Sequence, residues 1–290
     1  VKRGQQTLQF DVVREEIQSE SVKGEILEGN IGYIQITTFS DEDVKKLTKE
    51  KIDNYNKLGV SVLEFGTRRR HSYEVHDLVN ETLKTYGGQS FIGTSNVHFA
   101  MVNNRRPLGT HAHEWFMFHA AQYGFKMANS ISLEHWTQVY GGDLGIALTD
   151  TYTTDIFFNQ FDKKYSKLFD GVRHDSGDPI EFAQKVIAHY NKMGIDPKSK
   201  AIVFSDSLNY DKVKKIADFC QDKIKMSFGI GTNFTNDVGL PAMNMVIKLT
   251  DTKPDNTHWQ GVVKLSDEKN KNTGTPEMIA LAKEVLGIKS

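Results

Sequence analysis

Six short apolar runs between residues 61 and 232 each end in a polar or glycine-containing turn. The spacing of apolar residues between several of the runs is helical; Val75, Leu78, Val79 and Leu83, for example, fall on one helix face. Strands separated by helices favour a mostly parallel sheet with right-handed crossovers, either open or closed as a barrel. Enzyme sites form where such strands end, at their carboxyl edge. The apolar runs are 62–65, 91–92, 144–148, 171–172, 201–204 and 226–228.

Composition and charge are those of an ordinary globular enzyme. The 290 residues, 38% hydrophobic and 25% charged, are enough to bury one large core or two smaller ones. The formal net charge of -1 argues against a general attraction to nucleic acid or to an anionic membrane. No apolar run approaches the roughly 20 residues of a membrane-spanning helix. The one cysteine, Cys220, excludes an intramolecular disulfide, and its helical apolar context favours a buried thiol over a nucleophile.

Three regions of the chain differ in pattern. Residues 1–40 form a β-rich segment, with strands expected at 7–13 and 32–37. Residues 41–250 carry the alternation of strands and helices and are expected to form the catalytic α/β barrel, including a last strand at 243–249. Residues 251–290 predict a short strand at 262–264 and a helix at 276–286 that pack on a flanking domain. Without a signal-peptide pattern we expect a cytoplasmic protein, and without an initiator methionine we expect the native start to be missing.

Two histidines, His111 and His113, precede an apolar helix. The start of a helix presents unpaired backbone N–H groups that attract an anion, so a phosphate can bind beside an imidazole there, or a histidine can carry a phosphoryl group. A zinc site made of His111, His113 and His119 is disfavoured, because their spacing is not that of His-Glu-x-x-His. A helix-start histidine without a catalytic role fits the spacing equally well.

Three further loops combine groups that bind anions or cations. The carboxylates and hydroxyl of residues 175–178 can bind Mg²⁺, a sugar or a phosphate, although an aspartate cap before Pro179 also explains Asp178. Gly229 and Gly231, followed by Thr232, are similar to a phosphate-binding turn. The three arginines at 68–70 follow a buried strand, so they either form a solvated basic face or bind an anion.

Eight motifs in chain order resemble the nicotinate phosphoribosyltransferase family from about residue 43 to the C-terminus. The resemblance implies an irregular parallel α/β barrel of the type II phosphoribosyltransferase kind, with flanking antiparallel elements. It implies a homodimer that joins nicotinate to phosphoribosyl pyrophosphate, giving nicotinate mononucleotide and pyrophosphate for NAD biosynthesis. The resemblance further implies that ATP hydrolysis through a phosphohistidine, with Mg²⁺, assists the reaction. The motifs are EFGTRRRHS (64–72), GTSN (93–96), GTHAHEW (109–115), LGIALTD (144–150), RHDSGDP (173–179), FSD (204–206), SFGIGT (227–232) and KLSD (264–267).

The resemblance also implies roles for individual residues. His113, which precedes Glu114 and Trp115, matches the phosphohistidine, and we expect Asp150 to orient its imidazole. His111 is the competing candidate; alternatively it is a surface residue or a second phosphate contact. By the same resemblance, one aromatic ring and two guanidinium groups bind the base and the phosphoribosyl group, and Asp175 contacts the ribose directly or through Mg²⁺. The implied substrate contacts are Phe65, Arg68, Ser95, Arg173, Asp175, Gly177, Ser205, Gly229, Gly231 and Thr232.

Two features depart from the family pattern. The family's amino-terminal Asp-x-Asp-x-Tyr-Lys segment, which reaches the base site of a neighbouring subunit, has no match in this sequence. The alternative function is therefore an inactive remnant or a binding module of the same fold. Residues 1–40 instead resemble the junction between a PDZ module and the core of a carboxyl-terminal processing protease. This suggests a foreign or rearranged segment, and a peptidase function rests on these forty residues alone.

Overall fold

The computed structural model describes residues 2–3, 6–7, 22–27, 31–36, 40–237, 241–256, 258–268 and 271–288. The chain divides into two compact units, Val1–Asp43 and Val44–Ser290. In the first unit β1 (Lys2–Arg3) pairs antiparallel with β2 (Gln6–Thr7), and β3 (Val22–Leu27) pairs antiparallel with β4 (Ile31–Ile36). The strand expected at 32–37 corresponds to β4, whereas most of the strand expected at 7–13 lies outside the described residues.

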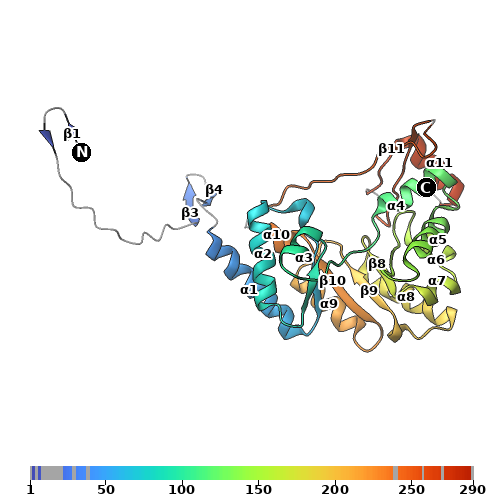
Figure 1. Ribbon diagram of the computed structural model, residues 1–290, viewed down its shortest axis with the longest axis horizontal. Coiled ribbons are helices and arrows are strands. Elements are labelled where there is room, and N and C mark those ends of the chain that lie inside the picture. Colours follow the sequence, from blue (N-terminus) through green and yellow to red (C-terminus); the bar gives the residue numbers. More distant parts are fainter. Residues whose placement is uncertain are drawn as a thin grey trace. The chain divides into compact units, whose positions relative to one another are not determined.

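A six-stranded sheet forms the centre of the second unit (Figure 1). Its spatial order is β6–β5–β10–β9–β8–β7, and every neighbouring pair is parallel. Each predicted apolar run forms one of these strands, so the expected α/β fold with a parallel sheet is confirmed. The strands are β5 (Ser61–Glu64), β6 (Phe91–Thr94), β7 (Ile146–Leu148), β8 (Gly171–His174), β9 (Ala201–Phe204) and β10 (Lys225–Ile230).

Helices connect the strands, and local side chains fix where several of them begin. Ser72 Oγ accepts a hydrogen bond from the backbone N–H of Val75, and Asp178 caps the helix that begins at Pro179. No described helix is both long and apolar enough to cross a lipid bilayer. The α-helices are α1 (Asp41–Leu58), α2 (Tyr73–Tyr86), α3 (Val97–Val102), α4 (His113–Tyr123), α5 (Ala128–Tyr140), α6 (Thr154–Gln160), α7 (Lys163–Leu168), α8 (Pro179–Met193), α9 (Tyr210–Cys220), α10 (Thr232–Thr235) and α11 (Pro276–Leu286), and the short 3₁₀ helices are η1 (Thr67–Arg69) and η2 (Pro197–Ser199).

Residues 241–250, which we call the strap, contain neither helix nor strand (Figure 1). The strand predicted at 243–249 is therefore wrong. Its apolar side chains do not cover a core, because Met243 and Ile247 are exposed. Arg69 donates hydrogen bonds to the carbonyl of Met245 and to Asn244 Oδ1, and the carbonyl of Thr250 accepts one from the backbone N–H of Val262.

The C-terminal region forms a small antiparallel pair and a helix. β11 (Asp251–Thr252) pairs with β12 (Gln260–Gly261), two residues before the strand expected at 262–264, and Lys264 makes an isolated bridge to Thr273. The helix predicted at 276–286 is α11. Its cap is Thr275, whose side chain accepts a hydrogen bond from the backbone N–H of Met278.

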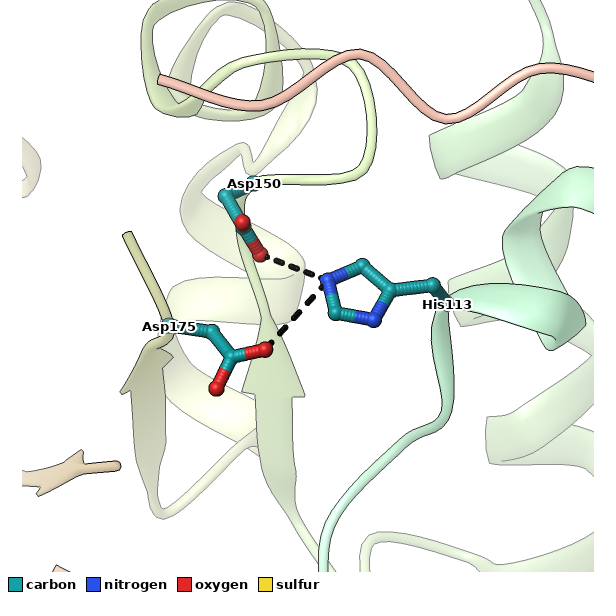
Figure 2. Close-up of side chains that lie close together, drawn as sticks. All are labelled: His113, Asp150 and Asp175. Carbon is teal, nitrogen blue, oxygen red and sulfur yellow. Dashed lines mark hydrogen bonds and ion pairs between the residues drawn. The ribbon is translucent and has the colours of Figure 1, made fainter. Parts of the chain in front are cut away.

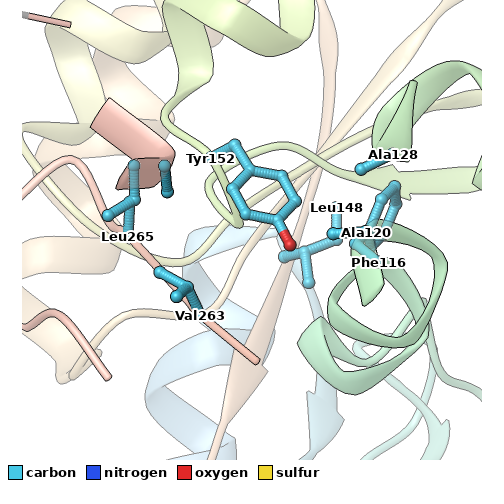
Figure 3. Packing of buried hydrophobic residues seen from close by; sticks show 8 residues of the cluster. Phe116, Ala120, Ala128, Leu148, Tyr152, Val263 and Leu265 are labelled. Carbon is cyan, nitrogen blue, oxygen red and sulfur yellow. The ribbon is translucent and has the colours of Figure 1, made fainter. Parts of the chain in front are cut away.

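A hydrophobic cluster joins this C-terminal region to the sheet (Figure 3). Burial of large apolar side chains stabilises such a contact by about 1.5–3 kcal/mol each. The cluster brings residues 262–266 against α4, which begins at His113, and against β7, which ends two residues before Asp150. Its buried members are Phe116, Ala120, Ala128, Leu148, Tyr152, Val263, Leu265 and Ala282.

Candidate active site

The predicted site residues meet at the carboxyl edge of the sheet. Asp150 follows β7, Asp175 follows β8, and His113 is the first residue of α4. Figure 2 shows the imidazole pointing toward both carboxylates. His113 Nε2 lies 3.0 Å from Asp150 Oδ1 and 3.5 Å from Asp175 Oδ2. The parallel sheet therefore brings together three groups that are up to 62 residues apart in the chain, counted from 113 to 175.

The environment of His113 favours a neutral ring whose Nδ1 carries the lone pair. Burial lowers its pKa, and this effect outweighs the hydrogen bond with Asp150, which would raise it. Because Nε2 faces the two carboxylates, the ring hydrogen belongs on Nε2 and the lone pair on Nδ1. On that side lies Lys248 of the strap, whose Nζ is 3.4 Å from Nδ1 and 3.2 Å from Glu114 Oε1. The imidazole thus presents a nucleophilic nitrogen beside an ammonium group.

Asp150 is buried and ionised. Burial alone would raise the pKa of this carboxyl, but its hydrogen bond with His113 and the nearby charges lower it strongly. Its second oxygen, Oδ2, accepts a hydrogen bond of 2.7 Å from Ser176 Oγ and lies 3.4 Å from Lys264 Nζ. Both oxygens are therefore engaged, which fixes the plane of the carboxylate against the imidazole.

Arg173 lies in the same cluster and is fixed at three positions. Its guanidinium donates to Asp175 Oδ1 at 2.7 Å, to Ser205 Oγ at 2.8 Å and to Thr110 Oγ1 at 2.8 Å. Burial would raise the pKa of Asp175, but the charge of Arg173 lowers it. The guanidinium carbon lies 5.8 Å from the centre of the Phe65 ring. A fixed planar cation therefore stands beside an aromatic ring, as a site for a flat anionic ligand requires.

Phe65 packs against β10 at a glycine. A Cβ on Gly229 would lie 2.6 Å from Phe65 Cδ2, and a Cβ on Gly231 would lie 3.3 Å from the carbonyl oxygen of Phe65. Gly229 belongs to β10, so the structure gives this glycine a packing role in addition to the phosphate contact expected of it. The absence of a side chain at this position lets the aromatic ring lie close to the sheet.

The remaining predicted residues surround this cluster at different distances. Gly177 has the positive φ of 84° that favours glycine, and its N–H donates to Glu268 Oε1. Arg68 lies in η1 and is exposed at the same edge. Within the described part of the chain no hydrogen bond joins Ser95 or Thr232 to His113 or to its carboxylates. Ser95 instead donates its N–H to the carbonyl of Glu64, and Thr232 begins α10.

His111 is not a surface residue. Only 1% of it is exposed, and its ring makes edge contacts with Trp136, Phe116 and Phe169, with centroid distances of 4.2, 5.4 and 6.0 Å. Burial in this aromatic box lowers its pKa to about 3. One alternative of the sequence analysis is thus wrong, because the helix start turns this side chain inward, away from solvent.

Among the described residues, one group of three histidine and aspartate side chains is close enough together to bind a metal ion. His113, Asp150 and Asp175 each offer a ligand atom, and these atoms lie within 4.8 Å of one another. Mg²⁺ prefers oxygen ligands and commonly binds one or two carboxylates together with substrate phosphates, so Asp175 Oδ2, which points away from Arg173, fits that ion. A zinc site with His119 does not form, because His119 bonds to His135 and to the carbonyl of Trp115.

Sequence reasoning missed several side chains of the site. Lys248 lies within the predicted strand 243–249, and no spacing rule links it to His113. Lys264 belongs to one of the family motifs, yet its contact with Asp150 depends on the packing of the C-terminal region. Thr110 and Ser176 also belong to these motifs; the first hydroxyl was given no role, and the second was expected to bind a ligand, whereas it donates to Asp150. The motif resemblance was the one signal that could have pointed to the last three.

The family model described as the nicotinate phosphoribosyltransferase (NAPRTase) family matches residues 60–290. The chain belongs to this family. The nicotinate phosphoribosyltransferase of Chromohalobacter salexigens is 60% identical over 249 residues, which cover 86% of this chain and 64% of that protein. That of Methanosarcina acetivorans is 45% identical over 270 residues, 92% of this chain and 65% of that protein. The chain thus spans about two thirds or slightly less of the length of these curated relatives.

Solved structures show the same likeness. The nicotinate phosphoribosyltransferase of Porphyromonas gingivalis superimposes with a TM-score of 0.84 at 42% identity, covering 93% of this chain and 77% of that one. The structure from Vibrio cholerae gives a TM-score of 0.79 at 37% identity, with coverage of 86% and 62%. The type II phosphoribosyltransferase-like fold expected from the motifs is therefore confirmed. The resemblance of residues 1–40 to a processing protease gains no support from these comparisons.

Because His111 is buried in its neutral form, we predict that it makes the free energy of unfolding fall at acidic pH. Its pKa is about 3 in the folded chain and 6.5 ordinarily, so below pH 6.5 the unfolded chain takes up a proton that the folded chain refuses. Its contribution to stability is complete above pH 6.5 and is lost as the pH falls toward 3. Between pH 6.5 and 5 the loss amounts to about 2 kcal/mol, at ~1.36 kcal/mol per pH unit. The variant His111→Phe keeps an aromatic ring at this position, and it should lack this pH-dependent loss of stability.

The measurement is urea unfolding of the parent and of H111F at pH 7 and pH 5. The difference in free energy of unfolding between the two proteins should change by about 2 kcal/mol between the two pH values. The variant His258→Gln, at a side chain that is 82% exposed, serves as the control and should track the parent. An unchanged difference for H111F would show that His111 does not resist protonation.

Proposed function

We propose that this chain transfers the phosphoribosyl group of phosphoribosyl pyrophosphate to nicotinate, giving nicotinate mononucleotide and pyrophosphate. The observation that supports it best is the pairing of Phe65 with the fixed guanidinium of Arg173 beside the His113–Asp150 pair. The relatives, which are named for this activity, favour it over an inactive remnant of the fold. A peptidase function has no support from them.

The site residues suit a reaction that needs positioning and charge neutralisation more than proton transfer. Pyrophosphate leaves the anomeric carbon with the bonding electrons, and the ring nitrogen of nicotinate attacks the carbon from the other side. Phe65 stacks on the pyridine ring, and Arg68 and Arg173 neutralise the base carboxylate and the phosphoribosyl group. Asp175 contacts the ribose. The expected contacts to the 5′-phosphate are Gly177, Ser205, Gly229, Gly231 and Thr232, and Ser95 is a further expected substrate contact.

Mg²⁺ is the metal that we propose for this site. Asp175 Oδ2 would bind it together with oxygens of the substrate, because the other oxygen of that carboxylate already accepts from Arg173. When bound, the ion neutralises charge on the departing pyrophosphate.

The parent should therefore lose activity on treatment with EDTA and regain it on addition of Mg²⁺.

Release of pyrophosphate from phosphoribosyl pyrophosphate tests the function directly. We expect it to require nicotinate, and nicotinamide to substitute poorly, because the amide lacks the charge that a guanidinium pairs with.

Arg173→Lys should lower kcat/KM for nicotinate by about two orders of magnitude, since a lysine cannot maintain the three fixed hydrogen bonds of Arg173. Arg105→Lys is the matched control, because Arg105 is exposed and donates only to the carbonyl of Lys84. Equal activity of R173K and parent would exclude this site assignment.

We further propose that ATP phosphorylates His113 at Nδ1. The lone pair of Nδ1 attacks the γ-phosphorus, the bond from phosphorus to the bridging oxygen breaks, and ADP leaves with that electron pair. Asp150 stabilises the positive charge that develops on the ring through Nε2–H, and Lys248 neutralises the phosphoryl oxygens. The burial of His111 among three aromatic rings argues against this role for it.

Labelling with γ-³²P-ATP checks this assignment. The parent and H111F should acquire acid-labile, alkali-stable label, His113→Asn should acquire none, and Lys248→Met should be labelled more slowly. Phosphorus NMR of the labelled parent should show the Nδ1 isomer. Label retained in H113N, or an unlabelled parent, would contradict the proposal.

Finally, we propose a homodimer. Apolar side chains are exposed on α3 and on the strap, as in surfaces that pair with another chain. Val97 and Met101 are 69% and 72% exposed, and Met243 and Ile247 are 75% and 68% exposed. Sedimentation velocity should give twice the mass of one chain for the parent and a monomer for Ile247→Asp; a monomeric parent would refute the proposal.

A further inference from the structure

We propose that Glu64 is a positioning residue for the base site, acting through the two loops that follow β5 and β6. This inference rests on the proposed role of Phe65 and Arg68 in binding nicotinate. Glu64 is the last residue of β5, directly before Phe65, and its side chain is completely buried. A buried carboxylate is costly unless its oxygens are paired, so its presence at this position calls for a role.

Both carboxylate oxygens of Glu64 have partners from different segments. Oε1 accepts a hydrogen bond from the backbone N–H of Gly66, in the loop that carries Phe65 and Arg68. Oε2 accepts a hydrogen bond of 2.6 Å from Thr94 Oγ1, at the end of β6, and lies 2.9 Å from Nε2 of His76 on α2. Thr94 and His76 are themselves buried, at 1% and 0% exposure. One carboxylate therefore joins a loop, a strand end and a helix.

The connection continues from Thr94 back to the loop after β5. Thr94 Oγ1 also accepts from the backbone N–H of Asn96, and the side chain of Asn96 donates to Thr67 Oγ1 at 3.2 Å. The backbone of Glu64 takes part as well, since its carbonyl accepts from the N–H of Ser95. These bonds form a closed ring between the two loops, so the position of Phe65 and Arg68 depends on Glu64 and Thr94 together.

The loop after β5 is also held by contacts with α10 and β10. Thr235 of α10 donates from Oγ1 to the carbonyl of Gly66 at 3.2 Å, and a Cβ on Gly66 would overlap that side chain. Phe65 bonds through its N–H to the carbonyl of Ile230. The loop is therefore enclosed between α10 on one side and the Glu64 carboxylate on the other, which pre-organises the aromatic ring for a flat base.

The variant Glu64→Gln tests the idea with almost no change of shape. Glutamine has one acceptor oxygen and one NH₂ donor, so it presents a donor to one of the two groups that now donate to Glu64. We expect KM for nicotinate to rise about tenfold, with kcat and KM for phosphoribosyl pyrophosphate changed by less than about threefold. Thr94→Val removes the hydroxyl that bonds to both Glu64 and Asn96. It should likewise raise KM for nicotinate while changing kcat and KM for phosphoribosyl pyrophosphate little. Thr94→Ser keeps the hydroxyl and should resemble the parent, and Glu81→Gln, at an exposed residue of α2, is the control for loss of charge.

Hydrogen–deuterium exchange of the peptide that covers residues 62–69 is the second readout, and it needs no activity. Exchange should be faster in E64Q and T94V than in the parent, T94S and E81Q. If E64Q fails to fold, T94V decides the question in the same two measurements. Unchanged nicotinate KM and unchanged exchange in the folded variants would overturn the proposal. A parent without nicotinate-dependent activity would refute the proposed function, while the exchange comparison would still decide whether Glu64 positions this loop.

Discussion

The parallel direction of the six strands is the constraint on which the rest of this structure depends. Because every strand of the sheet runs the same way, each of the loops after β5, β7, β8 and β9 leaves the sheet at one edge. Phe65, Asp150 and Asp175 therefore meet although long helical segments separate them in the chain. The helices between them return the chain to the opposite edge and bury the faces of the sheet.

Many charged groups lie close together at one edge of the sheet. Hydrogen bonds and ion pairs among them offset the cost of burying these charges. Asp150 is compensated by His113, Ser176 and Lys264, and Arg173 is compensated by Asp175 and two hydroxyls. Removing one member of such a group leaves another buried charge unpaired, which is far more costly than the loss of an exposed ion pair. Burial lowers the pKa of His113 despite the neighbouring Asp150, so a neutral imidazole lies beside an ionised carboxylate.

Residues outside the sheet complete the site. The strap contributes Lys248, and the C-terminal region contributes Lys264, which the hydrophobic cluster of Val263 and Leu265 brings against β7 (Figure 3). These lysines come from segments that carry little regular secondary structure. Lys248 lies beside His113 and Glu114 of α4, and Lys264 lies beside Asp150, so these cationic groups reach the site through tertiary contacts and not through the strand–loop pattern itself.

The sequence by itself determined the six strands of the sheet, two helix starts and the identity of the central residues. Apolar runs of two to five residues between helical stretches favour buried parallel strands, and Asp178 before Pro179 is a helix cap by local chemistry. Motif resemblance also singled out His113, Asp150 and Arg173, which the structure brings into one cluster. The roles of the peripheral residues Ser95 and Thr232 remain predictions. Only the tertiary structure decided that 243–249 is not a strand, that His111 is enclosed by aromatic rings, and that Gly229 accommodates Phe65. Each of these depends on which distant side chains pack together, and periodicity and local propensity contain no information about partners far away in the chain.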